Sequence, residues 1–494
     1  MDIVSLLILA AYTVCSILLL LYGLNTYYLI FLFLRRSDLS GKADREVEAA
    51  HGHRFAPGRT AELPVVTTQI PLYNELNVAE RVIRAVALID YPRERHQIQV
   101  LDDSDDGTRA VVDRVAARLR DEGAWIEVIR RTDRTGYKAG ALRAGMERAA
   151  GEFIAVFDSD FVPPRDFLRR CLPHLWADPN RGLVQARWDH LNPKESWLTR
   201  AQSLGIDGHF VVEQTARNRN GLFMNFCGTA GVWRRRAIED SGGWCHDTVT
   251  EDLDLSYRAQ LRGWRFHYMP SLLVPAELPG TYSAFKSQQY RWAKGTIQTA
   301  CKMLPKVWAA PGPFMRKLQA TVHLTHYSLH LQMTVLALLV LPLMLAFREG
   351  IALYRSIVFL TLLVPAAAGP SFGYLVCQYY GHPEDWRSRV LRLPFLLVVG
   401  FGICLSNAKA VLAGAFGRDN TFVRTPKSGS GGEWRYAVKR DWVPRFEVLL
   451  AIYCACTVAL LVGIQQYALV PFLCVYVCGF TVVGLRSMRE ARLR

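Results

Sequence analysis

The sequence lacks several of the features from which a protein's function is usually inferred. Its 494 residues contain no internal repeat and no low-complexity tract, and the only Gly/Ser-rich piece is the short segment 428–432. The 11 cysteines show no metal-ligand spacing and suggest no disulfide framework, which agrees with a soluble part that lies in a reducing cytosol. The net charge of +15 is not accompanied by a nucleic-acid-binding motif, so nucleic acid is not predicted as a partner.

Apolar residues, by contrast, are concentrated in long runs. A membrane span needs roughly 20 apolar residues, so each run is a candidate transmembrane helix. The first run is too long for the apolar region of a signal peptide and is predicted to be a retained anchor. Basic residues flank many of the runs, as the positive-inside rule expects of cytosolic loops. The runs are Ser5–Leu34, Val322–Phe347, Ile351–Val376, Leu393–Leu412, Phe446–Gln465 and Ala468–Leu485.

The order of these runs constrains the membrane topology. If the charged segment 37–300 and the basic loop 418–445 are both cytosolic, an even number of spans must separate them, yet three runs lie between them. We expect that Leu393–Leu412 does not cross, because Asn407 and Lys409 interrupt it and polar groups deep in a bilayer are costly. The sequence thus predicts an integral protein of the lipid bilayer, expected in a bacterial inner membrane, with a cytosolic soluble domain.

This topology divides the chain into parts of different character. Within residues 63–300, strand-like and helix-like patterns alternate, which predicts an α/β, Rossmann-like domain with a mostly parallel sheet. The expected strands are Val65–Ile70, Gln97–Leu101, Trp125–Arg130 and Phe153–Phe157. The expected parts are an anchor (1–36), a linker (37–62), the soluble domain (63–300), an interfacial helix (301–320), transmembrane helices (321–417), the basic loop (418–445), and a hairpin with a basic tail (446–494).

Two acidic pairs follow strand-like runs of the soluble domain. Asp102-Asp103 ends IQVLDD, and Asp158-Ser159-Asp160 ends FIAVFDSD. In an open α/β sheet, ligands bind beyond the carboxyl ends of the strands. Asp158 and Asp160 there can hold Mg²⁺ or Mn²⁺, which in turn can hold the diphosphate of a nucleotide sugar. A lone Asp-x-Asp is also common in turns, so this prediction depends on the other motifs.

Further polar residues are predicted at the same edge of the sheet. Asp102 and Asp103 are expected to recognise the base or ribose, although acidic residues also cap helices. Glu75 follows the first strand and is a candidate hydrogen-bond partner of the base, and Tyr73 a candidate packing partner. Lys138 lies between glycines at a helix start, where a cation with free backbone N–H groups suits phosphate.

Two later motifs predict the chemistry of transfer. Thr250-Glu251-Asp252 opens a helical run, and transfer to a hydroxyl needs a base within hydrogen-bond reach. Asp252 is the predicted base, with Glu251 beside it, although this motif is also typical of a helix cap. One base opposite the leaving diphosphate predicts inversion at the sugar carbon. The motif Gln288-Gln289-Tyr290-Arg291-Trp292 supplies hydrogen-bond donors for the diphosphate and an indole face for a sugar ring.

Taken in order, these motifs resemble those of processive membrane glycosyltransferases of family 2. Within that family the chain is most similar to the plant cellulose-synthase-like A and C groups and their bacterial relatives, which make β-1,4-mannan or glucomannan and the β-1,4-glucan of xyloglucan. The similarity covers about residues 63–300. The motifs are QIPLYNE, VLDDSDDGT, GYKAGALRAGM, FDSDF, LVQARW, GTAGVWRR, TEDLDLSYRA and QQYRW.

The resemblance implies a GT-A fold, a Mg²⁺ or Mn²⁺ ion, and UDP-glucose or GDP-mannose as donor. By this resemblance, Asp103 contacts the nucleotide, Asp158 and Asp160 bind the metal diphosphate, and Asp252 is the catalytic base. The acceptor and the entrance of a polymer channel would then involve Phe226, Cys227, Gly228, Gln288, Gln289, Arg291 and Trp292. The segment 422–427, with Phe422, Thr425 and Lys427, resembles the gating loop of cellulose synthase, but Arg424 stands where that pattern has valine.

Two functions remain open from the sequence. The first is the polymerisation of a β-1,4-linked hexose with passage of the chain across the membrane, as in cell-wall polysaccharide synthesis. The second is the transfer of a single sugar to a lipid, as in ceramide glucosyltransferases, which have a related set of motifs. The basic loop between membrane segments favours the first, because a channel rather than a lateral opening would need a gate.

Overall fold

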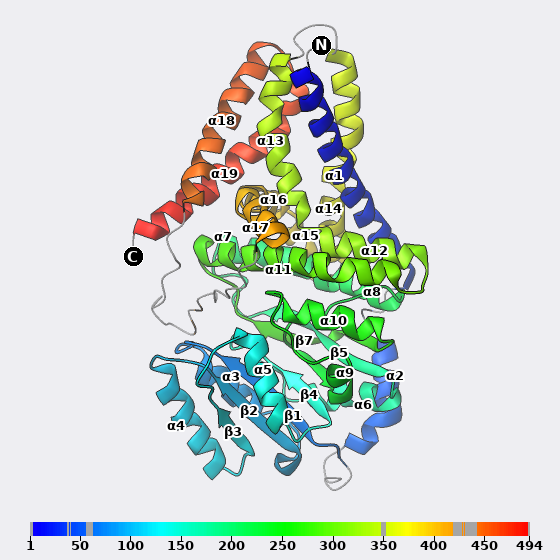
Figure 1. Cartoon of the computed structure of the whole chain (residues 1–494), viewed down its shortest axis with the longest axis vertical. Coiled ribbons are helices and arrows are strands. Elements are labelled where there is room, and N and C mark those ends of the chain that lie inside the picture. Colours follow the sequence, from blue (N-terminus) through cyan, green and yellow to red (C-terminus); the bar gives the residue numbers. More distant parts are fainter. Residues whose placement is uncertain are drawn as a thin grey trace.

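The computed structural model describes residues 3–36, 39, 41–55, 63–346, 352–417, 427, 429 and 442–492. An α/β domain forms one end of the molecule, and long helices form the other (Figure 1). Between them lies a layer of helices that includes α7 (Trp197–Asp207), α8 (Thr215–Arg219), α11 (Tyr282–Ala309) and α12 (Phe314–Thr325). The pocket described below opens under this layer.

The α/β domain contains a mostly parallel seven-stranded sheet with the order β3-β2-β1-β4-β6-β5-β7. Strands β1 to β4 are parallel to one another, β6 runs antiparallel to both of its neighbours, and β5 is parallel to β7. All four predicted strands are present. The strands are β1 (Val66–Leu72), β2 (His96–Asp102), β3 (Ile126–Ile129), β4 (Phe153–Val156), β5 (Arg181–His190), β6 (Gly231–Arg234) and β7 (Arg265–Ala276).

Helices cover both faces of this sheet. One hydrophobic cluster joins the sheet to α3 (Ala79–Ala87), α4 (Thr108–Asp121) and α6 (Phe167–Ala177). A second joins its other face to α5 (Tyr137–Arg148), α9 (Arg235–Asp240) and α10 (Glu251–Leu261). The central strands are buried on both sides, but only β4 is a continuous apolar run. Strands β1 and β2 carry buried polar side chains that pair with one another, as Gln69 does with Gln99 at 3.0 Å.

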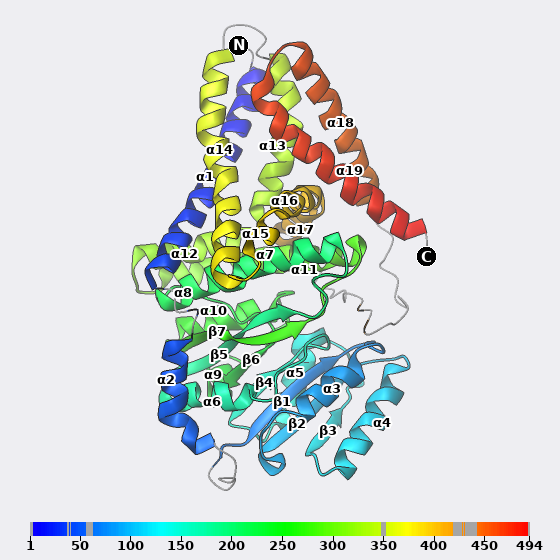
Figure 2. The same cartoon turned by 180° about the vertical axis from the view of Figure 1, so that it is seen from behind.

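The segment predicted as a linker contributes to the domain. Residues Lys42–His51 form α2, which lies against α6 beneath the end of α1 (Figure 2). Asp44 of α2 is fully buried, and the ring Nε2 of His267 lies 2.9 Å from its carboxylate. The polar composition that suggests a linker thus belongs to a helix whose buried acid has a partner on β7.

The helical end of the molecule has the length and apolarity of a membrane region. Among the described residues, four helices are long and apolar enough to cross a bilayer. They are α1 (Ile3–Arg36), α13 (Ser328–Ala346), α18 (Val443–Gly463) and the stretch Tyr467–Arg492, which contains α19 (Val470–Arg492). A further helix, α14 (Ala352–Gly381), packs beside α1.

The run predicted not to cross forms two short helices. The helical stretches Trp386–Gly402 and Cys404–Phe416 meet at a bend of 47°. The second stretch is α17, and the first contains α15 (Trp386–Val390) and α16 (Leu393–Gly402). Both α16 and α17 are seen nearly end-on in the two views, beside α7 and α11, so they lie across the long axis of the molecule (Figures 1 and 2).

Helix α11 connects the two ends of the molecule. It continues through residue 300, where a domain boundary was predicted, accommodates Pro305, and ends at Ala309, just before the Pro- and Gly-containing segment 310–313. The carboxylate of Glu490, on α19, accepts hydrogen bonds from the backbone N–H groups of Tyr282 and Ser283 at the start of α11. One turn later Lys286 donates to the fully buried carboxylate of Glu447, on α18, at 2.6 and 2.7 Å.

Candidate active site

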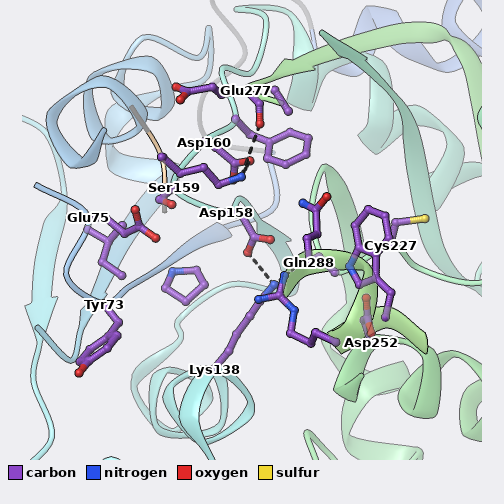
Figure 3. A pocket seen from close by; sticks show the side chains of 18 of the residues that line it. Tyr73, Glu75, Lys138, Asp158, Ser159, Asp160, Cys227, Asp252, Glu277 and Gln288 are labelled. Carbon is purple, nitrogen blue, oxygen red and sulfur yellow. Dashed lines mark hydrogen bonds and ion pairs between the residues drawn. The ribbon is translucent and has the colours of Figure 1, made fainter. Parts of the chain in front are cut away.

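A pocket lies at the carboxyl ends of β1, β4 and β5, beneath α11 (Figure 3). The strand register explains why distant motifs meet here, since parallel neighbours end at the same edge of the sheet. The predicted site residues that line the pocket are Tyr73, Glu75, Asp103, Lys138, Asp158, Asp160, Cys227, Gly228, Glu251, Asp252, Gln288, Arg291, Trp292 and Lys427.

Two lysines contact the carboxylates of the Asp-x-Asp motif. Lys138, from the start of α5, places its Nζ 2.6 Å from Asp158 Oδ1 and 2.9 Å from the carbonyl oxygen of Gly228. Lys427 forms an ion pair with Asp160. Each of the two carboxylates therefore has a cationic partner, because their negative charge attracts cations to this end of the pocket.

The donor set at this position suits a hard divalent cation. Asp158 and Asp160 supply carboxylate oxygens to the same pocket, and Mg²⁺ and Mn²⁺ prefer oxygen ligands in sites shared with phosphates. The residues present thus fit the predicted metal.

Asp252 and Glu251 lie at the first turn of α10 and face this cluster. The left-handed backbone of Gly228, with φ +79°, passes so close that an added Cβ would lie 2.9 Å from Asp252 Oδ2 and 3.3 Å from Lys138 Nζ. Burial, and then the neighbouring Glu251 carboxylate, raise the pKa of Asp252 to about 7. Burial also raises the pKa of Glu251. A carboxyl group with a pKa near neutrality is suited to accept a proton.

The two aspartates at the end of β2 have different surroundings. Asp103 lines the pocket, and Arg131 forms an ion pair with its carboxylate. Asp102 is fully buried inside the domain, where it accepts hydrogen bonds from Arg130 at 2.9 Å and from the backbone N–H of Ser104 at 3.1 Å. Asp102 therefore orders the loop after β2, while Asp103 is available to a ligand.

Aromatic and cationic residues form the wall beside Asp103. The guanidinium of Arg134 lies 3.2 Å from the ring centre of Tyr73 and 5.0 Å from that of Tyr137. Arg134 lines the pocket but is not among the residues predicted from the sequence. Its position two residues before the Gly136-Tyr137-Lys138 motif was the available signal.

The opposite wall is aromatic and lies next to the helical layer. Trp188, from β5, lies 6.4 Å from Trp292, from α11, between ring centres. Cys227 lines the same wall, and Gln214 and Asn225 donate hydrogen bonds to its sulfur. Trp188 ends the LVQARW motif and His190 lies two residues after it, but neither was predicted as a site residue.

Of the predicted site residues that the structure describes, three do not line the pocket: Asp102, Phe226 and Gln289. Phe226 is fully buried in the core, 5.6 Å from Trp233 between ring centres, and Gln289 receives a hydrogen bond from the Tyr327 hydroxyl at 3.4 Å. Phe422 and Thr425 lie outside the described residues. The side chains of adjacent residues point in different directions, so only some residues of a motif line a site.

Comparison with known proteins identifies the family. The family model described as "Glycosyltransferase like family 2" matches residues 64–295. Glucomannan 4-beta-mannosyltransferase 2 of Arabidopsis thaliana is 38% identical over 387 residues, which are 75% of this chain and 69% of that protein. The probable glucomannan 4-beta-mannosyltransferase 9 of Oryza sativa subsp. japonica is 34% identical over 435 residues, which are 85% of this chain and 79% of that protein.

These similarities establish the class of enzyme. The chain belongs to glycosyltransferase family 2, and its α/β domain has the GT-A fold. Among solved structures, a mannosyltransferase from Pyrobaculum calidifontis in complex with GDP-Man and Mn²⁺ matches 79% of this chain and all of that chain. The sequence identity is 20% and the TM-score is 0.48.

Proposed function

We propose that the protein transfers mannose from GDP-mannose, with inversion, to a growing β-1,4-linked glucomannan-type polysaccharide. The observation that carries the proposal is one carboxylate, Asp252, whose pKa is raised to about 7 and which shares a pocket with the Lys138–Asp158 pair. The names of the plant relatives favour mannose over glucose and a polymer over a single-sugar product.

The proposed reaction uses the residues of the pocket in a simple order. Asp252 takes the proton of the acceptor hydroxyl, whose oxygen attacks the sugar carbon from the side opposite the diphosphate. The bond to the diphosphate breaks, and the nucleoside diphosphate leaves with both electrons. Lys138 and Arg291 offer cations to that leaving group. An α-linked donor thus gives a β-linked product.

The proposed metal would be held by Asp158 and Asp160. When bound, a Mg²⁺ or Mn²⁺ ion offsets the negative charge of the diphosphate. Lys138 and Lys427 form ion pairs with the same carboxylates. Lys138 and Lys427 would then turn towards phosphate oxygens when the donor binds.

The proposed path of the polymer begins at the aromatic wall. Trp188 and Trp292 offer flat apolar surfaces, to which the faces of sugar rings bind well. Tyr327 follows, 6.0 Å from His330 at the start of α13 between ring centres. These residues lead from the pocket into the helical region, which supports translocation by the protein's own helices. The catalytic domain would lie in the cytosol, where nucleotide sugars are found; the plant relatives give no support to the expected bacterial membrane.

The direct test is to identify the product. Purified full-length protein in detergent is incubated with Mg²⁺ or Mn²⁺ and with radiolabelled GDP-mannose or UDP-glucose, each separately. We expect an insoluble product from GDP-mannose that β-mannanase digests and β-1,4-glucanase leaves intact. A product formed only from UDP-glucose would refute the donor assignment, and label found only in a single-sugar, organic-extractable product would show a lipid glycosyltransferase.

A further inference from the structure

A buried carboxylate joins the wall of the pocket to the membrane helices. Asp207, the last residue of α7, is 1% exposed. The Nε2 atoms of His190 and His382 lie 3.2 and 2.8 Å from its two oxygens. Arg389 donates to it at 3.3 Å, and Arg187 lies 3.8 Å away. Two of these four partners come from β5, and the other two from the segment that follows α14.

This network is stable only while Asp207 is charged. Burial opposes the ionised carboxylate, but the hydrogen bonds from the two histidines outweigh burial and hold the pKa of Asp207 well below its ordinary value. Loss of the charge would leave the largely buried guanidinium of Arg187 without its counterion, which is costly, whereas Arg389 would keep its ion pair with Asp385. Asp207 therefore fixes the position of each partner, including His190.

The hydrogen bond to Asp207 also determines which nitrogen of His190 carries the proton. A carboxylate can only accept, so the proton of the neutral ring resides on Nε2 and Nδ1 keeps its lone pair. Within the described part of the chain, Nδ1 has no hydrogen-bond partner, and His190 lines the pocket. The His190 side chain is 4% exposed, so this oriented hydrogen-bond acceptor belongs to the wall of the pocket.

The position of His190 indicates which ligand it meets. Trp188 and His190 are two residues apart on β5, so both project from the same face of the strand, and Trp188 lies opposite Trp292. The nucleotide-side residues follow β1, β2 and β4, whereas β5 lies beyond β6 in the sheet order. His190 therefore belongs to the wall that the proposed function gives to the polysaccharide.

We propose that His190 accepts a hydrogen bond from a hydroxyl group of the acceptor saccharide and that Asp207 is the positioning residue that orients it. The inference rests on the proposed function and adds one specific contact to it. The carboxylate of Asp207 also binds His382, which directly follows α14, and Arg389 of α15. Asp207 therefore fixes the position of His190 relative to these two helices.

Two substitutions of His190 distinguish a contact with the acceptor saccharide from a purely structural role. Asparagine places its side-chain oxygen near the position of Nδ1, so His190→Asn keeps the pocket-facing acceptor and loses the bond to Asp207. Glutamine reaches the position of Nε2, so His190→Gln keeps the bond to Asp207 and loses the pocket-facing acceptor. The exposed His53 provides a control, His53→Asn.

The experiment measures steady-state transfer from GDP-mannose to β-1,4-mannotetraose by the full-length protein in nanodiscs. We expect His190→Gln to raise the KM for mannotetraose about three- to tenfold, the value of one hydrogen bond, with the KM for GDP-mannose unchanged. His190→Asn should raise the KM for mannotetraose less, and His53→Asn should leave it unchanged. Asp207→Asn should raise the acceptor KM as His190→Gln does.

The outcomes distinguish the inference from the function on which it rests. If the wild-type chain transfers mannose but His190→Gln equals the wild type while His190→Asn is impaired, His190 is structural and the inference is wrong. A change in the KM for GDP-mannose alone would place His190 at the donor and would equally overturn it. A wild-type chain that transfers no mannose would refute the proposed function itself.

Discussion

Replacement of Asp252 by asparagine removes the proposed base while it preserves the size of the side chain. A base with a pKa of about 7 is half ionised at neutral pH. The kcat/KM of the wild type should therefore fall about tenfold for each pH unit below 7 and level off above it. General-base catalysis contributes about 10²- to 10⁴-fold, so Asp252→Asn should lower kcat by that factor and flatten the pH profile.

The same substitution should stabilise the fold at alkaline pH. The pKa of Asp252 is raised from 3.8 to about 7, so the folded protein disfavours the ionised carboxylate. This ionisation lowers the free energy of unfolding. The loss is absent below pH 4, grows as the pH rises, and is complete above pH 7. A shift of about three units sets an upper limit of about 4 kcal/mol, which the shared titration with Glu251 reduces.

Two measurements on the purified variant test this reasoning. Calorimetry should show that Asp252→Asn still binds GDP, and thermal unfolding should show a higher Tm than the wild type at pH 8 but not at pH 4. Asp121→Asn, at an exposed position at the end of α4, is the control for a lost surface carboxylate. Transfer at the wild-type rate by Asp252→Asn would refute the assignment of the base, and an unchanged Tm at pH 8 would refute the argument from burial.

Three further predictions follow from the geometry. Chelation by EDTA should stop transfer and added Mn²⁺ or Mg²⁺ should restore it; an enzyme indifferent to EDTA would exclude the metal role of the Asp-x-Asp motif. Trp292→Ala should raise the KM for an oligosaccharide acceptor about two- to tenfold, since it removes a stacking face worth about 0.5–1.5 kcal/mol, while Trp292→Phe should retain most of the affinity. Glu447→Gln should lower the Tm, because it leaves Lys286 buried without its counterion at a cost of about 3–5 kcal/mol; an unchanged Tm would show that the pair is not essential.

The sequence predicts the fold well wherever local pattern decides it. Apolar strands followed by acidic pairs specify β2 and β4, and the parallel sheet then brings Asp103, Asp158 and Asp160 to one edge. The prediction of site residues is less accurate, because it depends on the direction in which each side chain points. Side chains alternate along a strand, so Asp102 and Asp103 cannot both face the pocket, and a motif alone does not say which one does.

Long-range contacts explain most of what the sequence analysis missed. Asp44 looks like an exposed polar residue until His267, 223 positions away, is seen beside it. His382 lies 175 positions from Asp207. Arg134 acquires its role only because Tyr73, in the loop after β1, places its ring against the guanidinium. Such pairings depend on the packing of elements and leave no local pattern in the chain.

The attachment of α11 limits how far the enzyme can be divided. The helix that carries Gln288, Arg291 and Trp292 has its first turn closed by Glu490 and its buried Lys286 neutralised by Glu447. Both acids belong to the C-terminal helices, although the pocket lies in the α/β domain. A fragment that ends before α18 would lose both partners, so the catalytic domain cannot be separated from the C-terminal helices without freeing the start of α11 and leaving Lys286 without its counterion.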